Sequence, residues 1–192
     1  MVGLARQRHS FAEYLELEAI SRVKHEYLDG QVWAMAGGTP AHAAITVNVS
    51  VLLAMALRDR PCQVFSSDLR VRVQATGLAT YPDITVVCGA LETDPDDRAG
   101  NTAINPLLIV EVLSPSTEDY DRGEKLSHYK HIPSVREILL IAHDERRIES
   151  WRRSDSGWTL EVARAGVEDR LHLAAVECTL ELAEVYRNPL AR

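Results

Sequence analysis

The hydrophobic pattern at the start of the chain predicts a short helix followed by a hairpin. Ser10 and Glu13 form a capping box, which predicts an amphipathic helix that begins near Phe11 and ends before residue 22. The segment 26–35 then reads as two short strands around an Asp-Gly pair, and these two residues accept the positive φ of a tight hairpin turn.

The longest helical pattern covers residues 41–57 and contains no charged residue. Thr39 provides an N-cap and Pro40 a first-turn proline, and we expect this helix to end near Arg58. Its length approaches that of a membrane span, but spans usually contain about 20 strongly apolar residues, and this stretch includes His42 and other polar residues. A buried helix or a subunit interface is the favoured interpretation, and no membrane is expected as a partner.

From Cys62 onward, the hydrophobic period changes to that of strands. The predicted strands are 62–65, 69–73, 84–88, 107–113 and 137–142. We expect the first three to be neighbours in one sheet. A helix expected over 119–131 separates the last two strands, and the order strand, helix, strand favours a right-handed crossover and therefore a mixed sheet.

The C-terminal part of the chain reads as a β extension. Two further strands are predicted over 148–153 and 158–162, and a terminal helical turn over 180–186. No repeat, low-complexity segment or linker marks a second domain. The predicted fold class is α/β (α+β), with a mixed sheet core flanked by helices and a C-terminal β extension, in a single domain over 1–192.

The charge balance argues against a protein that coats nucleic acid without specificity. The chain carries 28 acidic and 21 basic residues, a formal net charge of −7, whereas nonspecific coating depends on the neutralisation of phosphates by many cations. A local basic groove stays compatible with this balance. The hydrophobic content of 46% is ample for a buried core.

The cysteines indicate the cellular compartment. Cys62, Cys88 and Cys178 are odd in number, widely spaced and mostly set among apolar residues, which predicts reduced core thiols rather than disulfides or a zinc site. Residues 1–10 are not followed by the leucine-rich core or the cleavage site of a secretory signal. We therefore expect a cytoplasmic protein.

Glu111 interrupts an otherwise apolar strand and is the firmest candidate for chemistry. Side chains alternate along a strand, so Glu111 shares a face with Leu113. A buried carboxylate is costly unless a cation or hydrogen bonds compensate its charge, and a metal ion would be sufficient. The alternative is an acid at a strand end that is solvated or paired with an arginine.

Asp83 gains its significance from Glu111. An aspartate just before an apolar strand is common as a turn residue. Paired with Glu111, however, it would supply the second carboxylate of a magnesium site, since Mg²⁺ commonly takes one or two carboxylates together with water and phosphate oxygens. The main-chain carbonyl of Val112 is a further candidate ligand.

Lys125 lies on the predicted helix four residues after Asp121, and two interpretations are open. The acid-then-base order at this spacing is that of an ordinary surface pair. Alternatively, the Lys125 ammonium stabilises phosphate charge or lowers the pKa of an attacking water. Tyr129 would share its helix face and line the cleft or the core. His42 is equally open between contact with phosphate or water and a partly buried, hydrogen-bonded role.

Several motifs together resemble one nuclease family. The most specific is Val-Glu-Val-Leu-Ser-Pro-Ser-Thr at 110–117, followed by Gly-Glu-Lys at 123–125. Further matches lie at 26–32, 41–42, 67–71, 81–84, 121–122 and 128–129. These segments resemble the Uma-two family of proposed restriction endonucleases, within the PD-(D/E)XK nuclease superfamily. The resemblance covers most of the chain and implies a restriction-endonuclease-like core.

The resemblance also implies roles for individual residues. Asp83 and Glu111 would bind Mg²⁺ or Mn²⁺, Glu26 would be an additional acid near the metal, and Lys125 would be the catalytic lysine. The superfamily's basic pattern has its lysine two residues after the acid, where this chain has Leu113. Lys125 inherits the role only if the following helix leans across the strand end. Asp68, in another matching segment, is more typical of a turn residue or of one that supports the site without contacting the metal.

These expectations describe a metal-dependent endonuclease that hydrolyses DNA phosphodiester bonds. Cutting both backbones of a duplex needs two cuts, so a homodimer is a natural arrangement, with the uncharged helix as a candidate interface. Two alternatives stay open. One is a noncatalytic nucleic-acid-binding or protein-binding module with the same fold, and the other is a metal-dependent hydrolase of a smaller phosphate ester.

Overall fold

The computed structural model describes residues 8–190 of the chain. Residues 1–7 and 191–192 lie outside the described residues. The expectation that the chain has no secretory signal concerns residues 1–10, and most of that segment is therefore outside the description.

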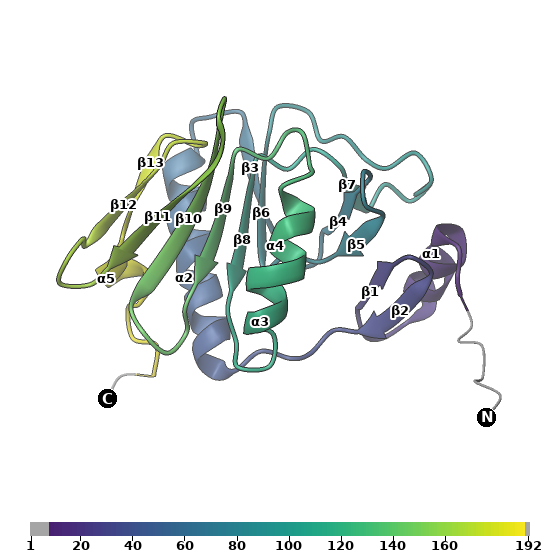
Figure 1. Ribbon diagram of the computed structural model, residues 1–192, viewed down its shortest axis with the longest axis horizontal. Coiled ribbons are helices and arrows are strands. Elements are labelled where there is room, and N and C mark those ends of the chain that lie inside the picture. The colour runs from purple at the N-terminus through teal and green to yellow at the C-terminus, as the bar shows by residue number, and fades with distance from the viewer. Residues whose placement is uncertain (1–7, 191–192) are drawn as a thin grey trace.

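A six-stranded mixed sheet lies at the centre of the molecule (Figure 1). In spatial order its strands are β11 (Gly157–Arg164), β10 (Arg147–Ser154), β9 (Glu137–Ile141), β8 (Leu108–Val112), β6 (Ile84–Cys88) and β3 (Cys62–Ser66). The neighbours β8 and β9 run parallel, and the other pairs are antiparallel. A parallel pair needs a crossover, which the helical segment between β8 and β9 provides, and the predicted mixed sheet is confirmed.

Helical segments cover both faces of this sheet (Figure 1). One face carries α2 (Pro40–Leu57), and the other carries the consecutive segments α3 (Glu118–Tyr120), η1 (Asp121–Lys125) and α4 (Leu126–Tyr129). The alternation along β8 divides the core accordingly, because Val110 and Val112 pack in the cluster that includes α2, whereas Ile109 and Leu113 pack with α4. Glu111 therefore faces the α4 side.

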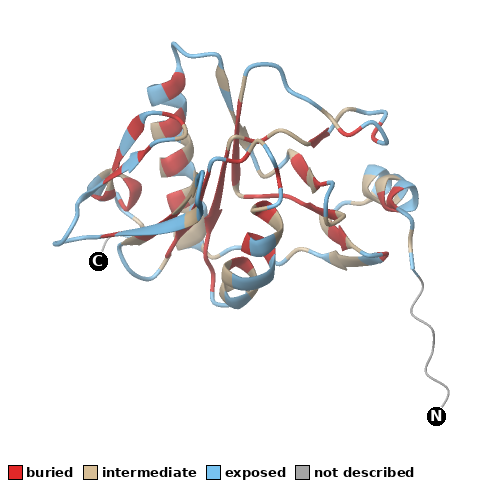
Figure 2. Ribbon diagram, turned by 45° about the horizontal axis from the view of Figure 1, so that its top comes forward, coloured by how far each residue is buried: buried red, intermediate tan, exposed pale blue. Residues whose placement is uncertain are grey.

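Helix α2 has the predicted start and end, with Thr39 as its N-cap and Pro40 in its first turn. Its inward stripe of Ile45, Val49, Leu53 and Leu57 is buried in the core, and Figure 2 shows buried and exposed residues alternating along the helix. Within residues 8–190, α2 is the one helix long and apolar enough to cross a membrane by length and composition. The buried stripe supports the interpretation as a core helix.

A second sheet packs beside the central one, next to α1 (Phe11–Ile20) (Figure 1). Its strands, in order, are β2 (Gln31–Ala34), β1 (His25–Leu28), β5 (Leu78–Thr80), β4 (Arg70–Val73) and β7 (Thr102–Ala103). The capping box of α1 and the hairpin of β1 and β2 are confirmed. The expectation that 69–73 lies beside 62–65 and 84–88 is wrong, because β4 pairs with β5 and β7 in this second sheet.

The C-terminal strands are more closely joined to the core than a separate extension would be. Strands β10 and β11 continue the central sheet, while β12 (Arg170–Leu173) and β13 (Cys178–Glu181) form a two-stranded sheet before α5 (Leu182–Val185). The helical turn predicted over 180–186 is therefore shorter, because β13 includes the first of these residues.

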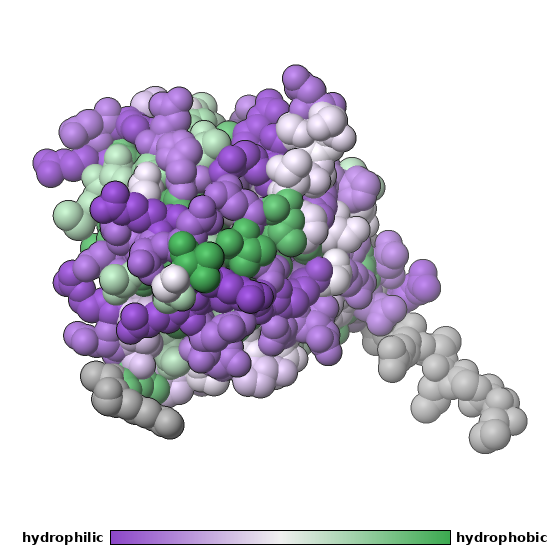
Figure 3. Space-filling view, turned by 60° about the vertical axis from the view of Figure 1, so that its left-hand side comes forward, coloured by the Kyte–Doolittle hydropathy of each residue, from purple (hydrophilic) through white to green (hydrophobic). Residues whose placement is uncertain are grey.

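Figure 3 shows the side of the molecule that lies at the left of Figure 1. A short band of strongly hydrophobic side chains crosses this mostly hydrophilic face.

The prediction of reduced thiols is wrong for two of the three cysteines. Cys62 and Cys88 form a disulfide, and Cys178 is buried and unpaired within residues 8–190. The antiparallel register of β3 and β6 places Cys62 directly opposite Cys88, a consequence of strand pairing that a separation of 26 residues does not reveal. The cytoplasmic location stays a prediction, with one observation fewer in its support.

Candidate active site

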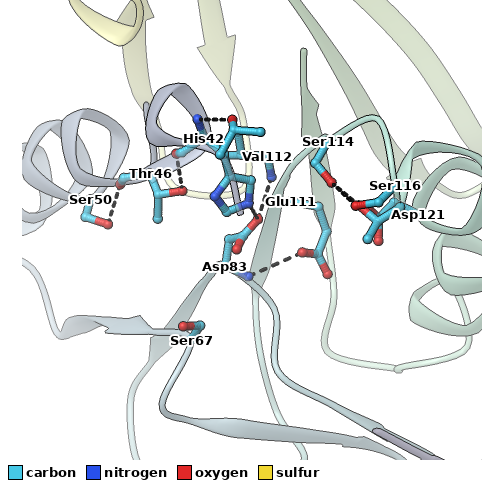
Figure 4. A network of polar contacts seen from close by, with 12 residues as sticks. His42, Thr46, Ser50, Ser67, Asp83, Glu111, Val112, Ser114, Ser116 and Asp121 are labelled. Carbon is cyan, nitrogen blue, oxygen red and sulfur yellow. Dashed lines mark hydrogen bonds and ion pairs between the residues drawn. The ribbon is translucent and has the colours of Figure 1, made fainter. Parts of the chain in front are cut away.

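Two acidic side chains meet where strand β6 begins and strand β8 ends. The antiparallel register pairs Ile84 with Val110, so the next residues outward, Asp83 and Glu111, lie opposite one another. The main-chain N–H of Asp83 donates to Glu111 Oε2 at 3.3 Å, and the N–H of Val112 donates to Asp83 Oδ2 at 2.8 Å. Figure 4 shows the two carboxylates together at this edge of the sheet.

Glu26 reaches the same place from the second sheet. It lies on β1, where its Oε2 accepts a hydrogen bond from the Trp33 indole at 3.1 Å and its Oε1 accepts one from the Thr80 hydroxyl. All four site residues chosen from the sequence line one cavity of about 290 Å³, namely Glu26, Asp83, Glu111 and Lys125.

The Lys125 ammonium is buried among three carboxylates. Its Nζ lies 2.9 Å from Glu111 Oε1, 3.3 Å from Asp121 Oδ1 and 3.4 Å from Glu26 Oε1. The helix that carries it does lean across the end of β8, as the resemblance requires. The surface-pair interpretation is half right, since Asp121 does pair with Lys125, but both side chains are buried in the cavity wall.

Leu113 clarifies why the lysine is on the helix. Its side chain is 1% exposed and packs in the cluster formed with α4, on the same face as Glu111. An ammonium within this cluster, which also includes Ile138 and Leu140, would lose the water that a charge requires. Lys125 is also buried, but its ammonium lies among carboxylates that compensate the lost water.

Burial has the largest effect on the pKa values of two acids in the cavity, Glu111 and Asp121. It raises the pKa of Glu111 to about 8, with Asp121 and Asp83 adding to the rise and the charge of Lys125 opposing it. Tyr129 donates a hydrogen bond to Glu111 Oε1, which also favours the charged carboxylate. Burial likewise raises the pKa of Asp121. The cavity lining places four carboxyl groups, those of Glu26, Asp83, Glu111 and Asp121, around a single lysine.

Burial works against the charged form of Lys125, yet the pKa of this lysine stays well above its ordinary value. The surrounding Glu111, Tyr129, Glu26 and Asp121 account for this rise. Lys125 therefore keeps its positive charge throughout the physiological range.

The structure favours the hydrogen-bonding interpretation of His42. Its Nε2 lies 3.0 Å from Asp83 Oδ2, and this contact raises the pKa of His42 although burial opposes the rise. In Figure 4 the imidazole points at the Asp83 carboxylate. Asp68, in contrast, is an exposed residue paired with Lys24 at 2.7 Å and does not line this cavity, as expected of a turn residue.

The oxygen atoms at this edge fit a hard divalent cation. No three His, Cys, Asp or Glu side chains within residues 8–190 are arranged to hold an ion by themselves. Mg²⁺, however, fills its remaining positions with water and phosphate oxygens. Asp83 and Glu111 could supply two carboxylates, and the Val112 carbonyl points to the same side of β8 as the N–H that contacts Asp83. The Lys125 ammonium lies beside Glu111 and already compensates part of the charge of that carboxylate.

The mixed sheet between helical layers is a restriction-endonuclease-like nuclease fold. A crystal structure from Anabaena variabilis, described as "a putative nuclease belonging to DUF820", is similar with a TM-score of 0.70 and 19% identity, and the match covers 86% of this chain and 91% of that chain. The chain belongs to the Uma2 family, described as "Putative restriction endonuclease", whose model matches residues 11–183.

Two proteins of Synechocystis sp. are similar over most of their length. "Uncharacterized protein slr1290" is 39% identical over 177 residues, covering 91% of this chain and 90% of its own. "Uncharacterized protein sll1609" is 35% identical over 150 residues, covering 78% of this chain and 84% of its own. The family resemblance seen in the sequence motifs is therefore confirmed.

Proposed function

We propose that the protein is a magnesium- or manganese-dependent endonuclease that hydrolyses phosphodiester bonds in DNA. One observation carries the proposal: Asp83 and Glu111 lie opposite one another at the sheet edge, and the Lys125 ammonium lies 2.9 Å from the Glu111 carboxylate. Two acids beside one buried cation suit the hydrolysis of a phosphodiester, because the acids can bind a metal and the ammonium can stabilise phosphate charge.

Each residue then has a separate task. When bound, Mg²⁺ or Mn²⁺ supplies neutralisation of the phosphate charge and activation of the attacking water. Asp83, Glu111 and the Val112 carbonyl would hold it, and His42 keeps the Asp83 carboxylate oriented. Lys125 presents its ammonium to the charge that develops on the phosphate. Glu26, held by Trp33 and Thr80, fixes the far side of that ammonium.

Supercoiled plasmid DNA tests the proposal. The wild-type protein should convert the plasmid to nicked or linear forms with Mg²⁺ or Mn²⁺, and an excess of EDTA should stop the reaction. DNA binding without cleavage in either metal would instead identify a noncatalytic nucleic-acid-binding module.

The size of the cavity supports one alternative substrate class. At about 290 Å³ the cavity is as small as the smallest ordinary ligand pockets. This size suits a single small phosphate ester as well as one nucleotide of a longer DNA strand. A metal-dependent hydrolase of small esters would hydrolyse bis-p-nitrophenyl phosphate while leaving plasmid DNA intact. An endonuclease would cleave the plasmid at protein concentrations at which the small diester reacts slowly.

Metal affinity should rise with pH up to about 8. Metal binding requires the ionised Glu111 carboxylate, whose pKa burial raises to about 8, so protons compete with the metal below that value. We expect the association constant for Mn²⁺ to rise by about one decade per pH unit well below the pKa, about 50-fold between pH 6 and pH 8, and by about a further factor of two before it levels off above pH 8. Calorimetric titrations in two buffers of different ionisation enthalpy measure both the affinity and the released proton. An affinity that does not change over this range would contradict the prediction.

We also propose a homodimer formed through the outer face of α2. This face exposes Val47 by 60%, Val51 by 51% and Met55 by 68%, on a helix without Asp, Glu, Lys or Arg. Exposed apolar stripes of this kind are typical of interaction surfaces. The same helix places His42 against Asp83, so an interface on α2 would fix the spacing of two active sites.

A single charge on α2 should dissociate the dimer. Light scattering should give twice the chain mass of 21.4 kDa for the wild type and the monomer mass for Met55→Glu, because the new carboxylate would be buried at the interface. Val167→Glu is the matched control, since Val167 is 86% exposed outside α2 and should leave the dimer intact. A wild type of monomer mass would contradict the proposed dimer.

A further inference from the structure

Asp121 has a place in the cavity wall that the proposed function does not use. The residue is only 4% exposed, and its Oδ1 lies 3.3 Å from Lys125 Nζ. In the view of Figure 4 the Glu111 carboxylate lies between Asp83 and Asp121. A buried carboxylate at this position needs a compensating partner, and Lys125 is that partner.

The local helix geometry directs Asp121 and Lys125 to the same side. Asp121 through Lys125 form a π-turn, η1, between the short α-helical segments α3 and α4. In a regular α-helix, residues four positions apart are rotated by about 40° from one another around the helix axis. Three residues spaced in this way therefore do not stay on one face. A π-turn is wider and reverses this drift locally, and such turns are frequent at functional sites. Asp121, Lys125 and Tyr129 thereby all reach the site.

The three carboxylates around Lys125 are not equivalent. Glu111 also accepts hydrogen bonds from the Asp83 N–H and the Tyr129 hydroxyl, and in the proposed function it binds the metal. Glu26 also accepts bonds from Thr80 and Trp33 of the second sheet. If Glu111 shares its charge with a metal, its attraction for the Lys125 ammonium becomes weaker, although it is the nearest carboxylate to that ammonium. Asp121 lies on the same helical segment as Lys125 and is not needed as a metal ligand.

We propose that Asp121 is a positioning residue that holds the Lys125 ammonium at the reacting phosphate while Glu111 serves the metal. The inference rests on the proposed function. It assigns to Asp121 no contact with substrate, so its whole effect on the reaction passes through Lys125. A displaced ammonium no longer faces the phosphate charge, and a misplacement of about 1 Å in an active site can cost about 100-fold in rate.

A double-mutant cycle tests this dependence. Asp121→Asn should lower kcat for plasmid cleavage by about 100-fold and change KM little, and Asp121→Glu should recover part of the loss. In the Lys125→Met background, Asp121→Asn should cause no further loss of kcat, because the group through which it acts is absent. Equal losses in the two backgrounds would overturn the inference and make Asp121 an independent participant.

A second measurement does not depend on activity. Acylation of lysine amines, followed by mass spectrometry, should label Lys125 faster in Asp121→Asn than in the wild type, while Lys130 is labelled equally in both. Lys130 is the matched control because its ammonium lies 3.5 Å from the Trp151 ring centre, away from Asp121. Equal labelling of Lys125 in both proteins would overturn the inference. A wild type that fails to cleave DNA but shows the labelling difference would instead refute the proposed nuclease while leaving the contact intact.

Discussion

Glu111→Gln should abolish both metal binding and DNA cleavage. The substitution keeps the size of the side chain but removes the charge of a carboxylate that faces Asp83 across the sheet edge. A bound metal ion contributes several kcal/mol of charge stabilisation to hydrolysis, so its loss should lower the cleavage rate by at least about a thousandfold. Calorimetric titration with Mn²⁺ should show no binding to the variant at concentrations that saturate the wild type.

Glu137→Gln is the matched control for this experiment. Glu137 is a fully buried acid on β9, the neighbour of β8, where it accepts hydrogen bonds from the Ser150 hydroxyl at 2.6 Å and the Ala175 N–H at 3.0 Å. It does not line the cavity. Its replacement should lower the melting temperature and leave Mn²⁺ affinity and cleavage unchanged. Loss of metal binding in both variants would mean that any buried acid of the sheet affects the site.

Lys125→Met should separate catalysis from metal binding. Without its ammonium, the cavity retains Asp83 and Glu111, and the acids that faced Lys125 become available to a metal. We therefore expect Mn²⁺ to bind at least as tightly as to the wild type. Removing one preorganised group that stabilises transition-state charge should lower kcat by about 100-fold to 1,000-fold. Single-turnover cleavage at saturating Mn²⁺ measures this loss.

Lys130→Met controls for the removal of a lysine from the same helical segment. Lys130 stacks on Trp151 at the end of α4, so its loss should affect packing but not the cleavage rate. If Lys125→Met lost metal binding together with activity, the ammonium would be a structural element of the metal site, and its catalytic assignment would be wrong.

The parts of the fold that depend on neighbouring residues could be predicted from the sequence. The capping box of Ser10 and Glu13, the hairpin turn and the Thr39 cap of α2 are local chemistry, and the structure has each of them. The faces of β8 follow from strict alternation, which places Glu111 and Leu113 on one side.

The parts that depend on distant pairing could not be predicted in this way. The disulfide of Cys62 and Cys88 follows from the register of β3 and β6, and β4 lies in the second sheet because its partners are β5 and β7. Strand partners are chosen by the packing of the whole molecule, which the alternation within one strand does not encode.

The site was predictable in its members but not in its geometry. The acid in an apolar strand indicated Glu111, and the family resemblance supplied Glu26 and Lys125. The π-turn that brings Asp121 into the cavity left one signal in the sequence, the spacing of Asp121 and Lys125, and that spacing is shared by ordinary surface pairs. The pair of Asp121 and Lys125 differs from a surface pair because both side chains are buried. Their burial depends on the second sheet, which contributes Glu26 to the cavity wall.

The most direct test of the central claim compares the wild type with Asp83→Ala in plasmid cleavage at saturating Mn²⁺. Asp83 is the less buried of the paired acids, with 18% of its side chain exposed, so its removal should disturb the fold least. We expect metal-dependent cleavage by the wild type and, at equal protein concentration, a rate at least about a thousandfold lower for Asp83→Ala. Equal cleavage by the two proteins would contradict the assignment of the active site to this edge of the sheet.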